Sequence, residues 1–440
     1  DELRCSSIIT NPARHTSAVK MFKDIVLARI ANPVSKRATV NLLEENFGIH
    51  LNLDKVYSMM DTLNDQAIEK LNDLMYGHTI DLFGGKIDVI FFDCTTLYFE
   101  AFFEDEFRKN GYSKDLKFNQ PQVLLALMVT KEGLPIGYKA FSGDTYEGHT
   151  LIPALNELKK KYSLDKVIYV ADAGMLNEDN LKELESLEAS EFEYIVGARL
   201  KNLPKALQKE IVDREKYTEV EPGYSIASFD YKGRQLIVSY RAERARKDAH
   251  DREKALEKLQ KKLAKHKNPK EYLSSYGYKK YLKVEGTGTV SLNEEKLTED
   301  SAWDGLRGVM TNAKRLSHHE VLSQYRNLWQ VENAFRLTKH DLKVRPIFHF
   351  KPHRVKAHLA ISFTAYALIK HLEYRVRLQY KALSPEKIRQ YLVNVQTSIL
   401  FDTKKKIRYG LPSRIALEAR KIYKLMRIDK KITPFIIDKM

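Results

Sequence analysis

The sequence predicts a mixed α/β protein in which a sheet flanked by helices lies between two helical regions. Three observations support this fold class. Residues 1–85 carry apolar residues at the three- and four-residue steps typical of helices. Dense apolar runs rich in β-branched and aromatic residues begin after Gly84 and Gly85. From residue 311 onward the helical spacing returns, now with many lysines and arginines.

The N-terminal 85 residues are expected to form a helical region that binds DNA. The helical spacing covers 19–31, 38–47 and 53–76, with Asn52 or Asp54 as the cap of the last helix. Short helices separated by basic residues suit a DNA-binding arm, although small helical domains have many other functions. No clear helix-turn-helix signature is present.

Residues 86–199 are expected to form the first part of a core domain. Strands are predicted over 86–92, 123–130 and 134–141, and a turn at Lys131-Glu132-Gly133 separates the last two. Further along, helices over 150–162 and 176–188 alternate with strands over 166–170 and 192–197. A meander followed by alternating helices and strands predicts a mixed sheet flanked by helices.

The pattern changes over residues 200–310, which are expected to form a β-rich insertion domain. A hairpin around Lys232-Gly233, a charged helix over 241–267 and short strands over 281–310 are predicted there. Residues 311–378 return to the core domain with helices over 321–342 and 355–378. Residues 379–440 are expected to form a basic helical tail, whose three lysines at 404–406 are either solvated or facing phosphates.

The excess of positive charge lies in the last third of the chain. Residues 311–440 contain 28 basic and 9 acidic residues, whereas residues 1–310 have a net charge of −3 out of +16 for the whole chain. Such asymmetry favours a polyanion partner, because each phosphate that is neutralised releases condensed counterions. The alternative is a solvated basic surface.

Several classes of protein do not fit the sequence. The longest apolar stretch, residues 359–369, is about half as long as a membrane span, and the first residues lack the apolar segment of a secretory signal. The two cysteines, Cys5 and Cys94, are too few for a disulfide framework or a zinc cluster. A cytoplasmic protein without a membrane partner is therefore expected.

Three carboxylates suggest a metal site. Asp93 follows the apolar run 86–92, Asp172 follows the run 166–170, and Glu332 lies in the predicted helix 321–342. If the two strands are parallel neighbours, both aspartates lie at one sheet edge, where ligand sites of α/β proteins are found. Taken singly, the aspartates could be turn residues and Glu332 an exposed helix carboxylate. Together they favour ligands of two divalent cations about 3.5–4 Å apart.

The helix that carries Glu332 has a second pattern. Tyr325, Glu332 and Lys339 are seven residues apart, so in a continuous helix they share one face with a drift of about 20° per step. Arg336 lies one turn beyond Glu332 on the same side. The alternative is a surface helix with incidental charges.

These motifs resemble those of bacterial insertion-sequence DDE transposases, in the branch with a Tyr-Arg-Glu-Lys signature around the catalytic glutamate. The similar segments are Phe-Phe-Asp93-Cys-Thr-Thr, Val-Ala-Asp172-Ala-Gly-Met, the run from Tyr325 through Glu332 to Lys339, and Val-Arg-Pro-Ile-Phe-His349. The resemblance spans residues 86–373 and includes the β-rich insertion.

The resemblance implies an RNase H-like catalytic core and Mg²⁺ or Mn²⁺ as a pair of cofactor ions. Asp93, Asp172 and Glu332 would be the catalytic metal ligands, and Tyr325 and Lys339 would contact phosphates of the transposon end. One position departs from the family, because Leu328 stands where the signature arginine is expected. Either Arg326 or Arg336 replaces that contact, or it is missing. We favour Arg336, which shares the predicted face of Glu332.

Other residues also look similar to the family. Hairpin-forming relatives carry a tryptophan in the insertion domain that stacks on a flipped base, and Trp303 lies at a comparable position. A tryptophan anchored in a strand is the alternative. His149 is expected either near the scissile phosphate or at a helix start. Trp329 is expected in the core.

The resemblance implies a DNA transposase that binds terminal inverted repeats and moves DNA by cut and paste. Water would attack a phosphate at the transposon end, and the freed 3′-hydroxyl would attack the opposite strand or target DNA. A homodimer is expected because two ends are cut together, with the tail as a candidate interface. The protein would act at the bacterial nucleoid. Two alternatives are a metal-dependent nuclease of the same fold without strand transfer, and a domesticated DNA-binding protein without catalysis.

Overall fold

The computed structural model describes residues 3–9, 17–112, 119–150, 152–154, 167–173, 178–186, 192–265, 280–285 and 289–439. The chain forms two compact units. The first unit comprises Asp1–Val167 and Asn327–Met440, and the second comprises Ile168–Arg326. The division into five segments drawn from the sequence stays a prediction.

The N-terminal region of the first unit is helical, as predicted. After the short 3₁₀ helix η1 (Cys5–Ile8) come α1 (Ser17–Ala31), α2 (Lys36–Phe47), α3 (Leu53–Asp61) and α4 (Asp65–Leu82). The single helix predicted over 53–76 is therefore wrong. The Asn64 side chain accepts a hydrogen bond from the Ala67 amide and starts a new helix there. Asn52 caps α3 in the same way.

Three antiparallel strands of the first unit form the predicted meander, in the order β3-β2-β1. They are β1 (Val89–Tyr98), β2 (Gln122–Val129) and β3 (Pro135–Ser142). The turn between β2 and β3 contains Gly133 at φ 76°, which favours glycine. One boundary was wrong: β1 does not end at Asp93 but continues for five residues, because Cys94-Thr-Thr-Leu-Tyr98 also suits a strand.

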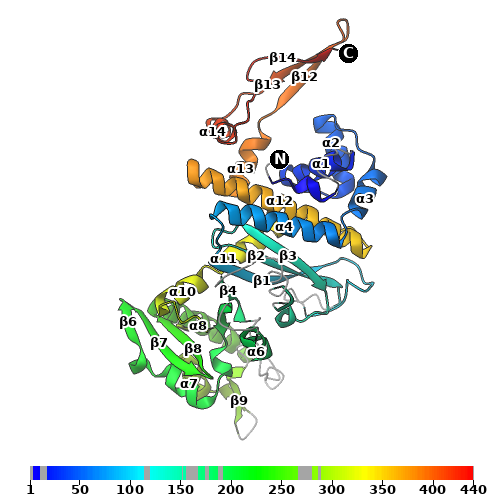
Figure 1. The fold of residues 1–440 in the computed structure, drawn as a ribbon. Helices are drawn as coiled ribbons and strands as arrows, with labels where there is room; N and C mark the ends of the chain where they lie inside the picture. Colours follow the sequence, from blue (N-terminus) through cyan, green and yellow to red (C-terminus); the bar gives the residue numbers. More distant parts are fainter. Residues whose placement is uncertain are drawn as a thin grey trace. The chain divides into compact units, whose positions relative to one another are not determined.

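Two long helices pack beside this meander, α4 and α12 (Pro352–Gln379) (Figure 1). The central part of α12 is buried almost throughout, and the Tyr366 hydroxyl donates to the Gly133 carbonyl oxygen at 2.8 Å. The Thr79 hydroxyl of α4 donates to the Pro135 carbonyl oxygen at 2.7 Å. The core of the first unit therefore lies between these helices and the sheet. No helix among the described residues has the length and apolar character that crossing a bilayer requires.

The continuous helix predicted over 321–342 is wrong. Helix α10 (His318–Arg326) ends in the second unit, and α11 (Trp329–Arg336) begins in the first, followed by the π-helical turn η8 (Leu337–Asp341). Asn327, a weak helix former, and Leu328 form a turn between α10 and α11. Tyr325 therefore lies on a different helix from Glu332.

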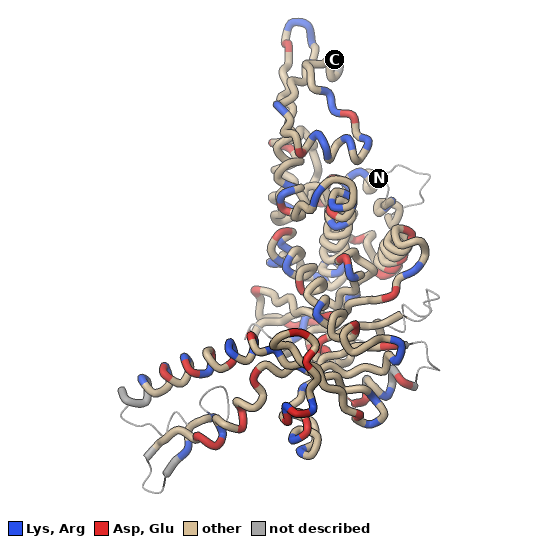
Figure 2. The backbone as a smooth tube through the Cα atoms, turned by 90° about the vertical axis from the view of Figure 1, so that its left-hand side faces the viewer, with Lys and Arg blue, Asp and Glu red and all other residues tan. Residues whose placement is uncertain are grey.

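The tail is not wholly helical either. Besides α13 (Pro385–Val393) and α14 (Leu417–Leu425), it contains an antiparallel sheet of β12 (Thr397–Asp402), β13 (Ile407–Pro412) and β14 (Phe435–Lys439). The Asp402 carboxylate accepts the backbone N–H groups of Lys404 and Lys405, both at 2.9 Å. This side chain turns the chain back on itself, and the basic hairpin tip is visible near the C-terminus in Figure 2.

The second unit contains a six-stranded run in the order β4-β5-β11-β8-β7-β6. The predicted hairpin is confirmed: Lys232 and Gly233 both have positive φ and connect β7 to β8. Strand β11 pairs with both β8 and β5, so strands of the expected insertion extend the same sheet. The strands are β4 (Val167–Ala171), β5 (Phe192–Ala198), β6 (Thr218–Glu221), β7 (Tyr224–Tyr231), β8 (Arg234–Arg241) and β11 (Leu306–Thr311).

Helices and a small second sheet complete the second unit. They are α6 (Glu178–Ser186), α7 (Lys205–Val212), α8 (Ala242–Lys265), α9 (Glu294–Ser301), and the pair β9 (Leu282–Glu285) and β10 (Thr289–Leu292). Acidic and basic residues alternate along α8, as the red and blue bands on its tube show (Figure 2). Most of the helix predicted over 150–162 lies outside the described residues. The mixed α/β fold class is confirmed.

Candidate active site

Asp93 is the charged residue of strand β1 in the first unit. Its neighbours Phe92 and Cys94 are almost completely buried, whereas Asp93 is half-buried. Asp93 Oδ1 accepts the Cys94 backbone N–H at 2.7 Å, and Asp93 pairs with Leu127 of β2. The strand on which this carboxylate lies is therefore fixed by packing on both sides.

Lys339 lies on the Asp93 face of β1. Its ammonium group donates a hydrogen bond to the Thr95 hydroxyl. Alternate residues of a strand point to the same face, so Asp93 and Thr95 share a face. The structure thus brings the predicted phosphate contact Lys339 to the strand face of the predicted metal ligand.

Glu332 is an exposed residue of α11, whose buried residues Val331, Ala334 and Phe335 face inward. This helix contacts both β1 and β2. Arg336, one turn further along, donates to the Asn333 side chain at 2.6 Å. Two arginines were considered as a replacement for the signature arginine that Leu328 displaces. Arg336 lies on the same helix as Glu332, whereas Arg326 lies on α10.

In the second unit, Asp172 directly follows β4, as predicted, and is exposed. The Tyr325 hydroxyl of α10 donates to Asp172 Oδ1 at 3.3 Å. Gly197 of β5 makes room for this contact, because a Cβ atom there would lie 2.3 Å from the Tyr325 hydroxyl oxygen and 2.9 Å from the Ala173 nitrogen. A glycine is thus required where Tyr325 approaches Asp172.

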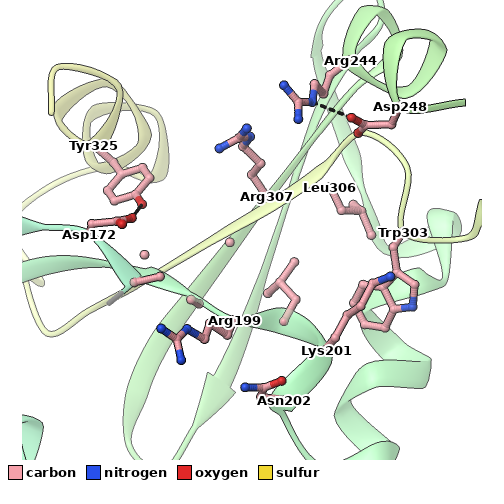
Figure 3. Close-up of a pocket in the computed structure, with 15 residues that line it drawn as sticks. Asp172, Arg199, Lys201, Asn202, Arg244, Asp248, Trp303, Leu306, Arg307 and Tyr325 are labelled. Atoms are coloured by element: carbon pink, nitrogen blue, oxygen red, sulfur yellow. Dashed lines mark hydrogen bonds and ion pairs between the residues drawn. The ribbon is translucent and has the colours of Figure 1, made fainter. Parts of the chain in front are cut away.

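Asp172 and Tyr325 form one side of an open pocket of about 440 Å³ (Figure 3). The pocket wall is rich in positive charge. Asp248, its other acidic residue, already pairs with Arg244 at 2.8 Å. The remaining charged and polar lining side chains are Arg199, Lys201, Asn202, Trp303 and Arg307.

Two of these arginines are available to an anion. Arg199 and Arg307 are both exposed, and within the described part of the chain neither side chain forms an ion pair. Figure 3 shows both side chains at the pocket that Asp172 and Tyr325 line. Guanidinium groups bind phosphate through two parallel hydrogen bonds, so this wall suits a phosphodiester.

Trp303 also lines the pocket, and it is not part of a strand. It lies half-buried in the turn between α9 and β11, so the alternative of a strand-anchored tryptophan is wrong. The Lys201 ammonium lies 5.8 Å from the ring centroid and pairs with Asp300 at 2.8 Å. Lys201 therefore occupies a position beside the ring in this structure.

The remaining residues singled out from the sequence lie on other elements. Arg326 is exposed on α10, with its guanidinium 5.9 Å from the Tyr224 ring centroid. His149 is exposed at the end of the 3₁₀ helix η2 (Glu147–His149) in the first unit, and its ring lies 5.5 Å from that of Tyr146. Trp329 is 51% exposed, so the expectation of a core position is wrong: it begins α11 outside the buried stripe.

The three predicted metal ligands belong to different units. Asp93 and Glu332 are in the first unit and Asp172 is in the second. Over the ranges that the structure describes, no group of three or more His, Cys, Asp or Glu side chains is arranged as a metal site.

Sequence reasoning missed the cationic wall of the pocket. Arg199 directly follows β5 in the same way that Asp172 follows β4, and Arg307 is the second residue of β11. A polar residue at the end of a core strand was the signal that identified Asp172, and applied again it would have found Arg199. Nothing local in the sequence connects Arg307 or Arg244 to Asp172.

Comparison with known proteins identifies the family of the chain. No curated protein matches the chain. One solved structure with partial similarity is the Mos1 transposase paired-end complex with left transposon end, with 13% identity over 42% of this chain and 60% of that chain. Its TM-score of 0.18 is too low to support any argument. Residues 84–368, more than half of the chain, match the family model described as Transposase DDE domain. The chain therefore belongs to the DDE-domain transposase family.

Proposed function

We propose that this protein binds transposon ends, cleaves them and joins the freed ends to target DNA by cut and paste. The observation that carries the proposal is the pocket of the second unit. It combines the exposed carboxylate of Asp172, the Tyr325 hydroxyl and a wall of basic side chains. A site for a phosphodiester beside a predicted metal ligand is what this chemistry requires.

Asp93, Asp172 and Glu332 would hold two Mg²⁺ or Mn²⁺ ions. The donor set fits these ions, because hard divalent cations prefer carboxylate oxygens. Members of the family generally use divalent metals. When bound, such a pair stabilises negative charge on the attacking and leaving oxygens. The proposal requires carboxylates from both units.

The side chains around the pocket would bind and orient the DNA. Arg199 and Arg307 would bind backbone phosphates next to Asp172, while Tyr325 orients the Asp172 carboxylate through its hydroxyl. Lys339, beside Thr95, would neutralise phosphate charge on the Asp93 side. Arg336 remains our choice for the missing signature arginine rather than Arg326.

Two further contacts are proposed. Trp303 would stack on an unpaired base, which requires Lys201 to move from beside the ring. His149 would approach the scissile phosphate. The reaction would run through attack of water on the end phosphate and then of the freed 3′-hydroxyl on the second strand. Two copies, with the tail as candidate interface, would act at the bacterial nucleoid.

The direct test compares Asp93→Asn, Asp172→Asn and Glu332→Gln on DNA that carries the terminal inverted repeats. Each should lower the cleavage rate by at least about 100-fold, because each removes a carboxylate ligand of the cations that would stabilise the transition state. Asp88→Asn is the matched control, since Asp88 is an exposed carboxylate just before β1. Substantial residual activity in the first three variants contradicts the assignment.

The same assay separates the alternatives. Nicks without joined products would identify a nuclease that never performs strand transfer. DNA binding without any Mg²⁺-dependent product would identify a non-catalytic DNA-binding protein.

A further inference from the structure

Three basic side chains of the first unit are buried away from the site described above. Arg29 of α1 is 4% exposed, and Lys36 of α2 and His358 of α12 are each 3% exposed. Among the described residues none of them pairs with a carboxylate; their hydrogen bonds go to backbone carbonyls and to one another. Burying such groups is costly unless their donors are used.

All three groups act on the short segment that follows the π turn. Arg29 Nη1 donates to the carbonyl oxygens of Leu342 and Lys343 at 3.1 and 2.9 Å. His358 Nε2 lies 3.0 Å from the Val344 carbonyl oxygen, which can only accept, so Nε2 carries the proton. The other ring nitrogen, Nδ1, then accepts from the Lys36 amino group at 3.3 Å, and burial, followed by the charge of Arg29, lowers the pKa of Lys36 well below its usual range.

The N–H groups of the same segment close the π turn. The Leu342 amide donates to the Leu337 carbonyl oxygen at 2.9 Å, and the Val344 amide donates to that of Thr338 at 3.0 Å. Between them, Lys343 has φ 45°, a left-handed conformation that costs free energy and persists only where the surroundings hold it. The N–H groups of the segment therefore hold the π turn, and its carbonyl groups are held by Arg29 of α1 and His358 of α12.

Lys339 lies within this π turn and donates to Thr95 on the Asp93 face of β1. Single π turns inside helices are rare, and those that occur often lie at functional sites. A continuous series of hydrogen bonds thus runs from α1 through the segment 342–344 to the turn that carries Lys339.

We propose that Arg29 and His358, with Lys36 orienting His358, are positioning residues that hold the π turn so that Lys339 stays on the Asp93 face of β1. Through them the N-terminal helices set the geometry of the cleavage site. This inference rests on the proposed function for its effect on cleavage, but not for its effect on the turn itself.

The ionisation of the cluster agrees with this arrangement. Burial, followed by the positive charge of Lys36, lowers the pKa of His358 well below its usual range, so the ring is neutral near pH 7 and can accept from Lys36. Burial lowers the pKa of Arg29 to about 10, so Arg29 keeps its donors. The other groups that face His358 are His349 and, through Lys36, the start of α2.

The first test uses Arg29→Lys, which keeps the charge but loses the forked pair of donors. Hydrogen exchange of the Leu342 and Val344 amides should become about tenfold faster, and single-turnover cleavage of end DNA about tenfold slower, with the DNA Kd within about twofold of wild type. Arg37→Lys is the control, because Arg37 is an exposed residue of α2. It should change neither rate.

His358→Gln and His358→Leu form the second test. Glutamine retains a donor for the Val344 carbonyl oxygen, so it should restore most of the cleavage rate and exchange protection that leucine loses. Normal amide exchange in Arg29→Lys overturns the proposal, and so does faster exchange with an unchanged cleavage rate. If wild type cleaves no end DNA, the proposed function fails, and the exchange measurement alone decides whether these residues hold the turn.

Discussion

Asp93 and Asp172 have the same predicted role and opposite surroundings. Asp93 lies within β1, between almost fully buried neighbours, and the strand position is set by packing. Asp172 is exposed beyond the end of β4, at the edge of an open pocket, and it accepts a hydrogen bond from Tyr325. The comparison teaches that apolar burial fixes the backbone position of Asp93, whereas a polar contact orients the Asp172 side chain. Variants should therefore affect the two units differently.

The largest effect on stability is expected in the apolar surroundings of Asp93. Phe92 is completely buried, so Phe92→Ala should lower the free energy of unfolding by about 3–5 kcal/mol through lost burial and a new cavity. Urea unfolding measures this loss. Phe102→Ala, at a side chain that is 77% exposed, is the control and should change little. Equal effects of the two variants would break the comparison.

Acid should also weaken the first unit before the second. Burial, reinforced by nearby positive charges, lowers the pKa of both His349 and His371 to about 4. Because each folded pKa lies below the unfolded value of about 6.5, the stability is complete above pH 6.5 and is lost as the pH falls toward 4. The loss is about 3 kcal/mol for each histidine.

The second unit offers the contrast at Asp300. Burial raises the pKa of this carboxyl, but hydrogen bonds from Lys201, Lys280 and Tyr281 outweigh it and lower the pKa overall. Its contribution is therefore present above the ordinary aspartate pKa and is lost only below it. Hydrogen exchange across both units between pH 7 and 3 should show peptides of the first unit opening at the higher pH. The reverse order would contradict the prediction.

A smaller effect is expected at Gly197, where polar geometry rather than packing is at stake. Gly197→Ala forces its Cβ against the Tyr325 hydroxyl and should cost about 1–3 kcal/mol while separating Tyr325 from Asp172. Urea unfolding measures this cost, and the cleavage rate follows the loss of the hydroxyl contact. Gly77→Ala is the control, because nothing lies within 4 Å of a Cβ in that helix, and it should stabilise the protein slightly.

The smallest effect on stability is expected at the exposed pocket arginines. Arg199→Ala and Arg307→Ala should each change the free energy of unfolding by less than about 0.5 kcal/mol. Each should instead weaken DNA binding and reduce the salt dependence of log K by about one unit, as loss of one phosphate contact does. Arg244→Ala, whose partner is Asp248, should weaken binding less. If the salt dependence of DNA binding is unchanged in all three variants, the pocket does not contact DNA phosphates.

Features that depend on neighbouring residues were predicted correctly from the sequence. The meander turn at Gly133, the hairpin at Lys232-Gly233 and the position of Asp172 after β4 all follow from turn chemistry and apolar runs. The confirmed mixed α/β class fits the RNase H-like core expected of the family. The metal ligands and DNA contacts stay predictions.

The errors arose where tertiary contacts override a periodic pattern. Seven-residue spacing placed Tyr325, Glu332 and Lys339 on one continuous helix, but Tyr325 belongs to α10 and Glu332 to α11, and Lys339 lies in the π turn η8. Tyr325 nevertheless reaches Asp172, through the space that Gly197 leaves. The sheet of the tail was missed because its strands, such as Thr397–Asp402, are short runs of five or six residues among helices.

The small sheet of the tail has a practical consequence. Ile399, Leu400 and Phe401 are 58%, 52% and 44% exposed, and since successive strand residues point to opposite faces, β12 presents apolar surface on both. Such a strand at a sheet edge is prone to uncontrolled pairing with further chains, which the like charges of the lysines at the adjoining hairpin tip would oppose. The purified protein should therefore aggregate faster at high salt, which screens the charges of those lysines, and turbidity measures this.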